Sequence, residues 1–304
     1  MRIAFVNTLY KLAAQNPNII LITGDLGFSV FEDYIKEFPR QFLNAGVAEQ
    51  NMTGIAAGIA MEGKIPLIYS IVPFVTMRNF EQVRNDICYQ DLDVKIVGVG
   101  AGYSYGMYGH THYGLEDMGI LRTIPGITII APGDPVEVEL ATVAALKTRG
   151  PIYIRLGKAG ESLVHKIRPK FEIGKGIVIA EGKDITLLAC GTMLPVALEV
   201  SDILKNKYSV KVVSMHTVKP IDDVLIKNLS RKMKGIFTLE EHAAIGGLGS
   251  AVAEVLAENR LDVFFKRFGT PDHFSKVSGK QKYMREQNGL SAKIIAGEII
   301  KKMS

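Results

Sequence analysis

Cysteine is scarce and tryptophan is absent in this chain of 304 residues, whose two cysteines are Cys88 and Cys190. These cysteines lie far apart and outside any CxxC spacing, which argues against a disulfide framework and against a structural zinc site. No apolar run approaches the ~20 residues that cross a bilayer. Met1 leads directly into Arg2–Val6, without the segments of a secretory signal. We therefore expect a cytoplasmic protein with reduced thiols and no membrane partner.

An excess of charge of one sign is also missing. The 36 basic and 31 acidic residues give a formal net charge of +5, and without a concentrated basic face we expect no nucleic-acid partner. The most basic stretch, Lys158–Lys183, is rich in glycine and is typical of a solvated linker. The HExxH, Walker A, EF-hand and nucleophile-elbow motifs are absent, which excludes the enzyme classes that depend on them. We predict no metal ligands in this chain.

The chain does contain a regular alternation of short apolar runs and helical patterns. In the first half the runs are rich in Ile and Val without polar alternation, which is typical of parallel strands covered on both faces. They are Ile19–Ile22, Ile65–Ile71, Val94–Val99, Ile127–Ile130 and Ile152–Leu156. Helices are predicted at Arg2–Gln15, Glu49–Met61, Asn79–Tyr89 and Pro135–Lys147, the last with Asp134 as its N-cap.

The alternation restarts near residue 184. Predicted strands are Ile185–Ala189, Val210–Met215, Ile236–Leu239 and Val263–Phe268, and predicted helices are Leu194–Lys207, Asp222–Lys232, Gly249–Asn259 and Ser291–Lys302. This pattern predicts an α/β protein with two doubly wound domains and mainly parallel sheets. We place the domains at residues 1–165 and 184–304, with a linker over 166–183.

Two loops have the composition of functional sites. Asp25 lies in Gly24–Gly27 directly after a predicted strand, where ligands gather in α/β sheets. The alternative is a turn aspartate that bonds nearby N–H groups. The glycine- and tyrosine-rich loop from Gly98 to Gly114 carries His110 and His112, and a loop of this length is typical of a functional segment.

Glu49 begins a predicted helix within the sequence Gly46–Met52. A carboxylate at this place either takes part in chemistry or only complements the helix dipole, and the residues alone leave both open. Gly54 and Gly58 follow on one face, and glycine weakens a helix, so they predict a close helix–helix contact such as a subunit interface. Near the C-terminus, Gly246–Ala251 favours a close-packed turn over an anion site.

Five segments resemble the transketolase family in identity and in order: Gly24-Asp25-Leu26, Gly46-Val47-Ala48-Glu49-Gln50, Ser70-Ile71-Val72-Pro73-Phe74, Gly109-His110-Thr111-His112 and Glu240-Glu241-His242. The likeness covers essentially the whole chain, but only the C-terminal part of a full-length transketolase. It implies a thiamine-diphosphate pyrimidine-binding fold followed by a transketolase C-terminal domain. It also implies transfer of a two-carbon ketol unit between sugars or sugar phosphates.

The resemblance implies roles around thiamine diphosphate. Glu49 matches the glutamate that bonds N1′ of the aminopyrimidine and thereby assists proton removal from thiazolium C2. Phe74 matches the aromatic that stacks on the aminopyrimidine, while Ile71 and Met77 stand where two other aromatics are expected. Asp25 matches an aspartate beside the cofactor.

The resemblance also implies substrate contacts. His112 matches a histidine that contacts donor and acceptor oxygens, and which of His110 and His112 is essential stays open. Ser29 and Arg2 match positions that bind the substrate phosphate.

Three departures from the family pattern concern the substrate. Tyr108 stands where many transketolases have an aspartate, and two phosphate-contacting residues are replaced by Ala131 and Gly100. Each missing charge-assisted bond is worth roughly 1.5–3 kcal/mol. A modified, shorter or differently phosphorylated sugar is therefore expected.

A separate partner is implied as well. Full-length transketolases hold Mg²⁺ and the cofactor diphosphate through an N-terminal domain with a Gly-Asp-Gly motif, which this sequence lacks. We therefore expect the C-terminal subunit of a split transketolase, self-associated through the pyrimidine domain in a heterotetramer with an N-terminal subunit. The alternatives are a β subunit of a 2-oxo acid dehydrogenase E1, a relative of deoxyxylulose-phosphate synthase, and a non-catalytic assembly subunit.

Overall fold

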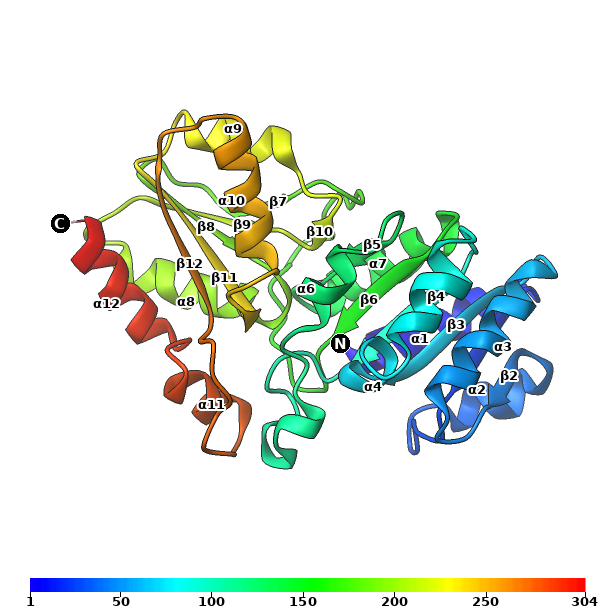
Figure 1. Ribbon diagram of the computed structural model, residues 1–304. Helices are drawn as coiled ribbons and strands as arrows, with labels where there is room; N and C mark the ends of the chain where they lie inside the picture. The colour runs from blue at the N-terminus through cyan, green and yellow to red at the C-terminus, as the bar shows by residue number, and fades with distance from the viewer. Residues whose placement is uncertain (304) are drawn as a thin grey trace.

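The structure, a computed structural model, describes residues 1–303, which form two α/β domains lying side by side (Figure 1). The strands of the first domain are β1 (Ile19–Thr23), β2 (Phe42–Asn44), β3 (Ile65–Ile71), β4 (Lys95–Val99), β5 (Thr128–Ile130) and β6 (Ile152–Leu156). A further strand, β10 (Thr217–Lys219), comes from the second half of the chain. The order is β10-β5-β6-β4-β3-β1-β2, and within this sheet β10 alone is antiparallel to its neighbour.

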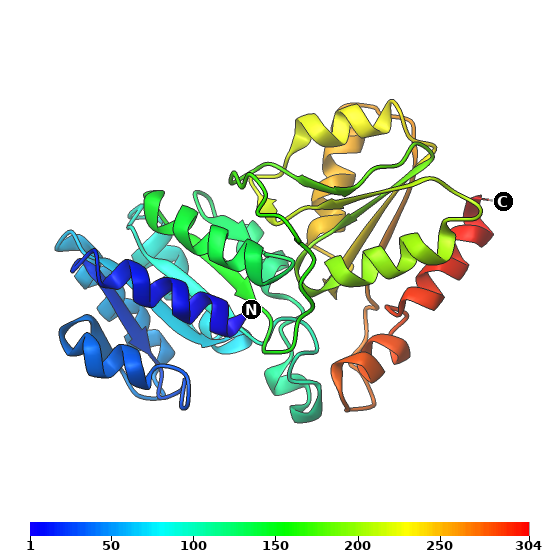
Figure 2. The same cartoon turned by 180° about the vertical axis from the view of Figure 1, so that it is seen from behind.

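Helices cover both faces of this first sheet. On one face α1 (Arg2–Ala13) packs beside α7 (Pro135–Lys147), as Figure 2 shows, and α2 (Glu32–Glu37) joins them through Tyr34. The other face carries α3 (Glu49–Met61), α4 (Val72–Thr76), α5 (Phe80–Gln82), a π-helical turn (Val83–Cys88) and α6 (Asp117–Arg122). Ile19 and Leu21 therefore pack towards α1 while Ile22 packs towards α3. Burial on both faces is the reason that these strands lack polar alternation.

The second domain has a five-stranded sheet in the order β12-β11-β8-β9-β7. Its strands are β7 (Ile177–Ala180), β8 (Ile185–Ala189), β9 (Val210–Ser214), β11 (Gly235–Ala243) and β12 (Phe264–Thr270). Helices α8 (Leu194–Leu204) and α12 (Ala292–Met303) cover one face, and α9 (Asp223–Ser230) and α10 (Leu248–Glu258) cover the other. The remaining helix, α11 (Gln281–Gln287), reaches back to the first domain, where Met284 packs against Tyr103 and Tyr113.

The predicted fold class is confirmed: both sheets are mainly parallel, and only β7 and β10 run antiparallel to their partners. The strands Ile65–Ile71, Ile152–Leu156 and Ile185–Ala189 and the helices Glu49–Met61 and Pro135–Lys147 have the predicted bounds. Asp134 caps α7, because its carboxylate accepts the backbone N–H of Glu137 at 2.8 Å.

The predicted linker over 166–183 is too long, because β7 lies inside it and pairs with β9. This edge strand has three half-buried residues and one exposed residue, Val178, and is flanked by glycines and lysines, so its sequence has no strong strand signal. The two domains are also less separate than the boundaries suggest. β10 pairs with β5 across the boundary, and one hydrophobic core runs from Ile129 in the first domain to Val213 and Met215 in the second.

The small-residue face of α3 is open within the chain. Apart from the backbone of α3 itself and the neighbouring residues in the chain, no atom of the described residues lies within 4 Å of where a side chain on Gly54 or Gly58 would begin. The predicted close contact at these glycines is therefore not made between parts of this chain, and a contact with another subunit stays a prediction. Among residues 1–303, none of the helices combines the length and hydropathy that crossing a membrane requires.

Candidate active site

Two neighbouring loops meet beyond the carboxyl ends of β1 and β2, and Asn44 joins them. Its Oδ1 accepts the backbone N–H groups of Asp25 and Gly46, each at 3.0 Å, and its Nδ2 donates to Asp25 Oδ1 at 3.1 Å. Gly46 has a φ of 72°, which a residue with a side chain rarely adopts. The turn that it permits leads directly into α3, so the first residue of that helix, Glu49, starts beside the Asp25 loop.

Asp25 and Ser29 share a backbone feature that is uncommon in proteins. Both are non-glycine residues in the left-handed region, with φ of 56° and 60°. Such conformations gather at functional sites, where the surrounding structure enforces them. Both residues are exposed, and the backbone N–H of Ser29 bonds the Glu32 carboxylate. The structure therefore presents Asp25 and Ser29 at the surface of the loop that borders Glu49.

Glu49 is a buried carboxylate, with only 1% of its surface exposed. A side chain at Gly24 would begin 3.7 Å from Glu49 Oε1, so the Asp25 loop directly covers it. Ser70, near the end of β3, lies 3.5 Å away through Oγ. The principal partner of Glu49 is Arg78, whose Nη1 donates to Oε2 at 2.9 Å. A buried carboxylate with one charged donor is a group poised to share a proton or a hydrogen bond with a ligand.

Phe74 lies beside this pair and connects it to the histidine loop. The Arg78 guanidinium carbon lies 4.3 Å from the centre of the Phe74 ring, and the His112 ring meets Phe74 edge-on with centroids 5.3 Å apart. Phe74 is in α4, directly after β3, whose last residue is Ile71, and Met77 caps the same helix. The side chains of Ile71, Phe74 and Met77 are all half-buried. The structure therefore brings Glu49, Phe74 and His112 into one continuous site.

Aromatic and cationic side chains continue the site beyond His112. The Tyr108 ring lies 5.2 Å and the Tyr105 ring 6.2 Å from the His112 ring, centre to centre. Lys158, which follows β6, places Nζ 4.7 Å from the centre of the Tyr105 ring. Burial raises the pKa of Tyr105, and the nearby charge of Arg2 opposes that shift.

Arg2 belongs to this cationic end of the site. Its charge also opposes the rise that burial causes in the pKa of Tyr69. Its Nε is buried and has no hydrogen-bond partner among residues 1–303. An anionic ligand can accept a hydrogen bond from such a buried cationic donor without breaking an existing hydrogen bond.

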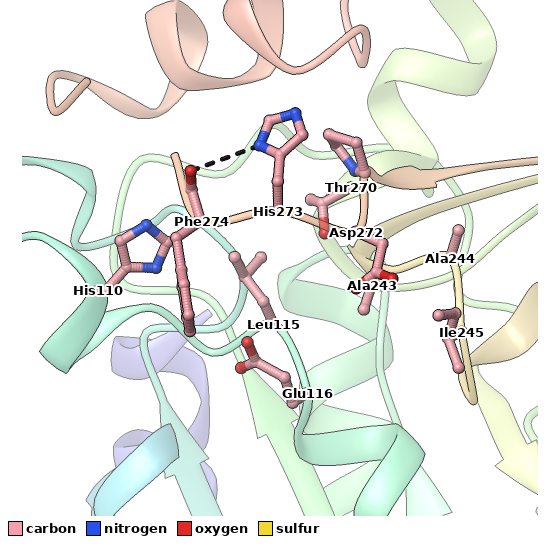
Figure 3. A pocket seen from close by; sticks show the side chains of 11 residues that line it. His110, Leu115, Glu116, Ala243, Ala244, Ile245, Thr270, Asp272, His273 and Phe274 are labelled. Carbon is pink, nitrogen blue, oxygen red and sulfur yellow. Dashed lines mark hydrogen bonds between the residues drawn. The ribbon is translucent and has the colours of Figure 1, made fainter. Parts of the chain in front are cut away.

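His110 does not join His112, although only Thr111 separates them. Its Nε2 lies 3.2 Å from the carbonyl oxygen of Ser275 in the second domain, and its ring packs edge-on against Tyr113 and Phe274. His110 also lines a pocket of about 320 Å³ at the domain junction, together with Glu116, Phe274 and neighbouring residues (Figure 3). The predicted substrate residue His110 thus faces this separate pocket, away from Phe74.

The two replaced phosphate contacts have structural reasons. Ala131 is fully buried at the domain junction, where its N–H bonds the His216 carbonyl at 2.7 Å. At Gly100, with φ of 88°, a side chain would begin 2.2 Å from the Tyr105 ring. Tyr105 therefore occupies the space that a histidine at position 100 would need.

The residues present fit the cofactor that the resemblance implies. Glu49 is buried and adjoins the exposed Asp25 loop, the Phe74 ring already carries a planar group, the Arg78 guanidinium, over its face, and a cationic end follows His112. Sequence reasoning missed Arg78, Tyr105 and Lys158. Arg78 could have been found from its i, i+4 spacing to Phe74, whereas Lys158 had no motif around it.

Comparisons with known proteins identify the family of this chain. The family model of the transketolase pyrimidine-binding domain matches residues 1–160, and that of the transketolase C-terminal domain matches residues 174–295. A putative transketolase C-terminal section from Methanocaldococcus jannaschii is 39% identical over 100% of this chain and 96% of its own length. The 6-deoxy-6-sulfo-D-fructose transketolase subunit SqwH from Clostridium sp. is 36% identical over 97% of this chain and 92% of its own length.

A solved structure supports the same assignment. A split-gene transketolase, described as an inactive β4 tetramer, superposes with a TM-score of 0.88 at 37% identity and covers 98% of this chain and 96% of its own length. Its length, like that of the two relatives, is nearly that of this chain. The chain therefore belongs to the transketolase family and corresponds to the C-terminal subunit of a split transketolase.

Proposed function

We propose that this chain, assembled with a separate N-terminal subunit, transfers a two-carbon ketol unit between anionic sugars with thiamine diphosphate as cofactor. The observation that carries the proposal is the buried carboxylate of Glu49, which Arg78 connects to Phe74 and thereby to His112. When bound, thiamine diphosphate supplies a nucleophilic carbon, its thiazolium C2. The residues of this chain then bind, orient and exchange protons around it.

Each residue has a role that its surroundings support. Glu49 holds a proton at N1′ of the aminopyrimidine, because its carboxylate is shielded from water and retains free acceptor capacity. Phe74 orients the pyrimidine by stacking, with Ile71 and Met77 as aliphatic walls. His112 is half-buried and contacts substrate oxygens, where it can give or take a proton. Asp25 borders the cofactor from the neighbouring loop.

The anionic end of the substrate is assigned to the cationic end of the site. Lys158, which lies over the Tyr105 ring, and Arg2, whose buried Nε lacks a partner among residues 1–303, supply the positive charge that Gly100 and Ala131 cannot provide. Ser29 supplies a hydroxyl from the Asp25 loop. The related subunit from Clostridium is named for a sulfosugar, so an anionic group other than phosphate is compatible with this class of subunit.

The N-terminal subunit is assigned the cofactor diphosphate and the divalent cation, here Mg²⁺ or a similar ion. Among residues 1–303 no group of three His, Cys, Asp or Glu side chains is arranged to hold a metal ion. Self-association is assigned to the exposed small-residue face of α3, which gives a heterotetramer of two copies of each subunit. The test is copurification of this chain with a neighbouring gene product that contains Gly-Asp-Gly.

The decisive experiment compares Glu49→Gln with Glu62→Gln in the reconstituted complex. Both residues lie at ends of α3, but Glu62 is exposed and distant from Phe74. We expect Glu49→Gln to lower kcat by roughly 10²-fold or more, as loss of a proton-transfer group does, and Glu62→Gln to leave kcat unchanged. Wild-type activity in Glu49→Gln would rule out the proton-relay role of Glu49.

The competing enzyme classes differ in their donor. The complex is assayed with ketose donors and separately with pyruvate. Ketol transfer from a ketose supports the proposal. Turnover of pyruvate without ketol transfer would instead assign the chain to the dehydrogenase or deoxyxylulose-phosphate-synthase reaction.

A further inference from the structure

Arg78 makes two contacts that converge on the proposed cofactor site. Its Nη1 donates to Glu49 Oε2 at 2.9 Å, and its guanidinium carbon lies 4.3 Å from the centre of the Phe74 ring. One planar, nitrogen-rich group therefore bonds the buried carboxylate and stacks on the aromatic ring at the same time. These are the two residues that the proposed function assigns to the aminopyrimidine.

The guanidinium resembles an aminopyrimidine in the properties that these residues recognise. Both groups are flat and delocalised, and both direct N–H donors outward in the plane of the group. A carboxylate bonds the edge of such a group and an aromatic ring covers its face. Glu49 and Phe74 therefore cannot hold Arg78 and the aminopyrimidine together.

We infer that Arg78 is an internal stand-in for the aminopyrimidine, which must leave Glu49 and Phe74 before the cofactor can contact them. The inference rests on the proposed function. In the chain without cofactor, Arg78 balances the buried charge of Glu49 and keeps the site in its folded shape. With cofactor, Arg78 returns to solvent.

The exposure of the two partners is suited to such an exchange. Glu49 is 1% exposed and fixed at the start of α3, whereas the side chain of Arg78 is 46% exposed. Arg78 follows Met77, which caps α4, so its side chain can rotate into solvent without disturbing that helix. The pair therefore has one fixed member and one member that can withdraw.

The exchange makes a quantitative prediction about cofactor affinity. If Arg78 holds Glu49 and Phe74 in nine-tenths of the molecules, the apparent Kd for the cofactor is about tenfold weaker than that of the open site. Removing the guanidinium removes this competition. Arg78→Met should therefore tighten cofactor binding, the reverse of what loss of a binding residue causes.

A first measurement tests the pair in the chain alone. Thermal unfolding of the wild type, Arg78→Met, Glu49→Gln and the double variant forms a double-mutant cycle. We expect Arg78→Met to lower Tm and Glu49→Gln to restore most of the loss, because the uncharged amide no longer needs a cation. Additive effects on Tm would show that the two side chains do not interact and would overturn the inference.

A second measurement tests the competition in the complex with the N-terminal subunit. The Kd for thiamine diphosphate in the presence of Mg²⁺ is measured by calorimetry for the wild type, Arg78→Met and Arg78→Lys. The control is Arg84→Met, an arginine in the following turn whose Nη1 bonds Asn85 instead of Glu49. We expect a Kd about tenfold lower in Arg78→Met, an intermediate value in Arg78→Lys and the wild-type value in Arg84→Met.

The outcomes separate this inference from the proposed function. Wild-type binding with an equal or weaker Kd in both Arg78 variants would overturn the inference and leave the cofactor assignment intact. No binding by the wild type, under conditions where the two subunits form a complex, would overturn both. Because Arg78→Lys keeps the charge beside Glu49, it provides the comparison even where Arg78→Met is poorly folded.

Discussion

His110 and His112 are close in the sequence but have different surroundings. His112 lies among Phe74, Tyr105 and Tyr108, next to the Glu49–Arg78 pair. His110 is held by Ser275 and Phe274 of the second domain. Although one short 3-10 turn contains both, their neighbours differ, so we expect His112 to serve catalysis and His110 to serve domain packing.

Substitution of each histidine by asparagine tests this division. We expect His112→Asn to lower kcat by roughly 10²-fold without a change in Tm. His110→Asn loses one hydrogen bond and two ring contacts, and its Tm should fall by about 2–4 °C while kcat stays within a few fold of the wild type. A larger loss of activity in His110→Asn than in His112→Asn would reverse the assignment.

The position of Lys158 predicts that KM depends on the charge of the substrate. Replacing it by methionine removes a charge-assisted bond to the anionic group of the sugar, worth roughly 1.5–3 kcal/mol. We expect KM for phosphorylated or sulfonated sugars to rise about tenfold or more, with kcat little changed. KM for uncharged sugars should stay constant, and Lys170→Met, an exposed linker lysine, is the control. An equal rise in KM for charged and uncharged sugars would contradict the role.

At the scale of elements, helix α10 depends on a buried carboxylate from a strand. Glu240 of β11 accepts the N–H groups of Leu248 and Gly249 at 2.7 and 2.8 Å, at the first turn of α10. The free N–H groups of the Gly246–Ala251 turn therefore find their acceptor within the protein. This agrees with the close-packed turn that the sequence favoured over an anion site. Glu241, its neighbour, bonds Thr192 on one side and the N–H of Tyr103 in the first domain on the other.

We predict that Glu240→Gln destabilises the chain by about 1–3 kcal/mol, because the amide nitrogen that replaces one carboxyl oxygen cannot accept a bond from one of the two buried N–H groups. Glu254→Gln is the matched control, since this carboxylate is on the exposed side of α10 and pairs with Arg122. Its effect should stay within about 0.5 kcal/mol. Urea unfolding at constant pH measures both. Equal effects in the two variants would show that α10 needs no buried cap.

At the scale of the whole molecule, the two domains are joined by polar contacts that need particular protonation states. His242 of β11 accepts the N–H of Gly119 in α6 through Nε2 at 3.0 Å, so this nitrogen must be unprotonated. Burial lowers the pKa of His242 to about 4, and the charge of Arg155 adds to the shift while Asp117 opposes it. Burial likewise lowers the pKa of His216, at the β9–β10 connection, to about 3.

This arrangement predicts a loss of stability in acid. The unfolded chain binds a proton at His242 below pH 6.5, whereas the folded chain binds it only near pH 4. The stabilisation from the neutral form is therefore complete above pH 6.5 and is lost as the pH falls towards 4, by roughly 3 kcal/mol for this residue. His242→Asn keeps an acceptor for Gly119, and its unfolding free energy should fall less over this range. Parallel curves for the wild type and the variant would contradict the prediction.

Much of this molecule follows from the order of its residues. Apolar runs without polar alternation indicated strands buried on both faces, and the alternation with helical patterns indicated two mainly parallel sheets. Asp134 before Pro135 marked the start of a helix, because a cap depends only on neighbouring residues. Glu49, Phe74 and His112 were found because each lies in a short segment whose residues resemble a known family.

Tertiary structure decided the rest, because it brings together residues that are distant in the chain. Neither the three-residue strand β10 nor the exposed edge strand β7 has a periodic hydrophobic pattern. Each is identified as a strand only by its hydrogen-bonded pairing with a neighbouring strand. Several loops meet at one end of a sheet, and their meeting decides three features: the pairing of Arg78 with Glu49, the different neighbours of His110 and His112, and the place of Lys158 beside Tyr105. The sequence by itself determined the fold class, the family and the helix start at Glu49, since these are encoded locally. The surroundings that give each side chain its chemistry arose only on folding.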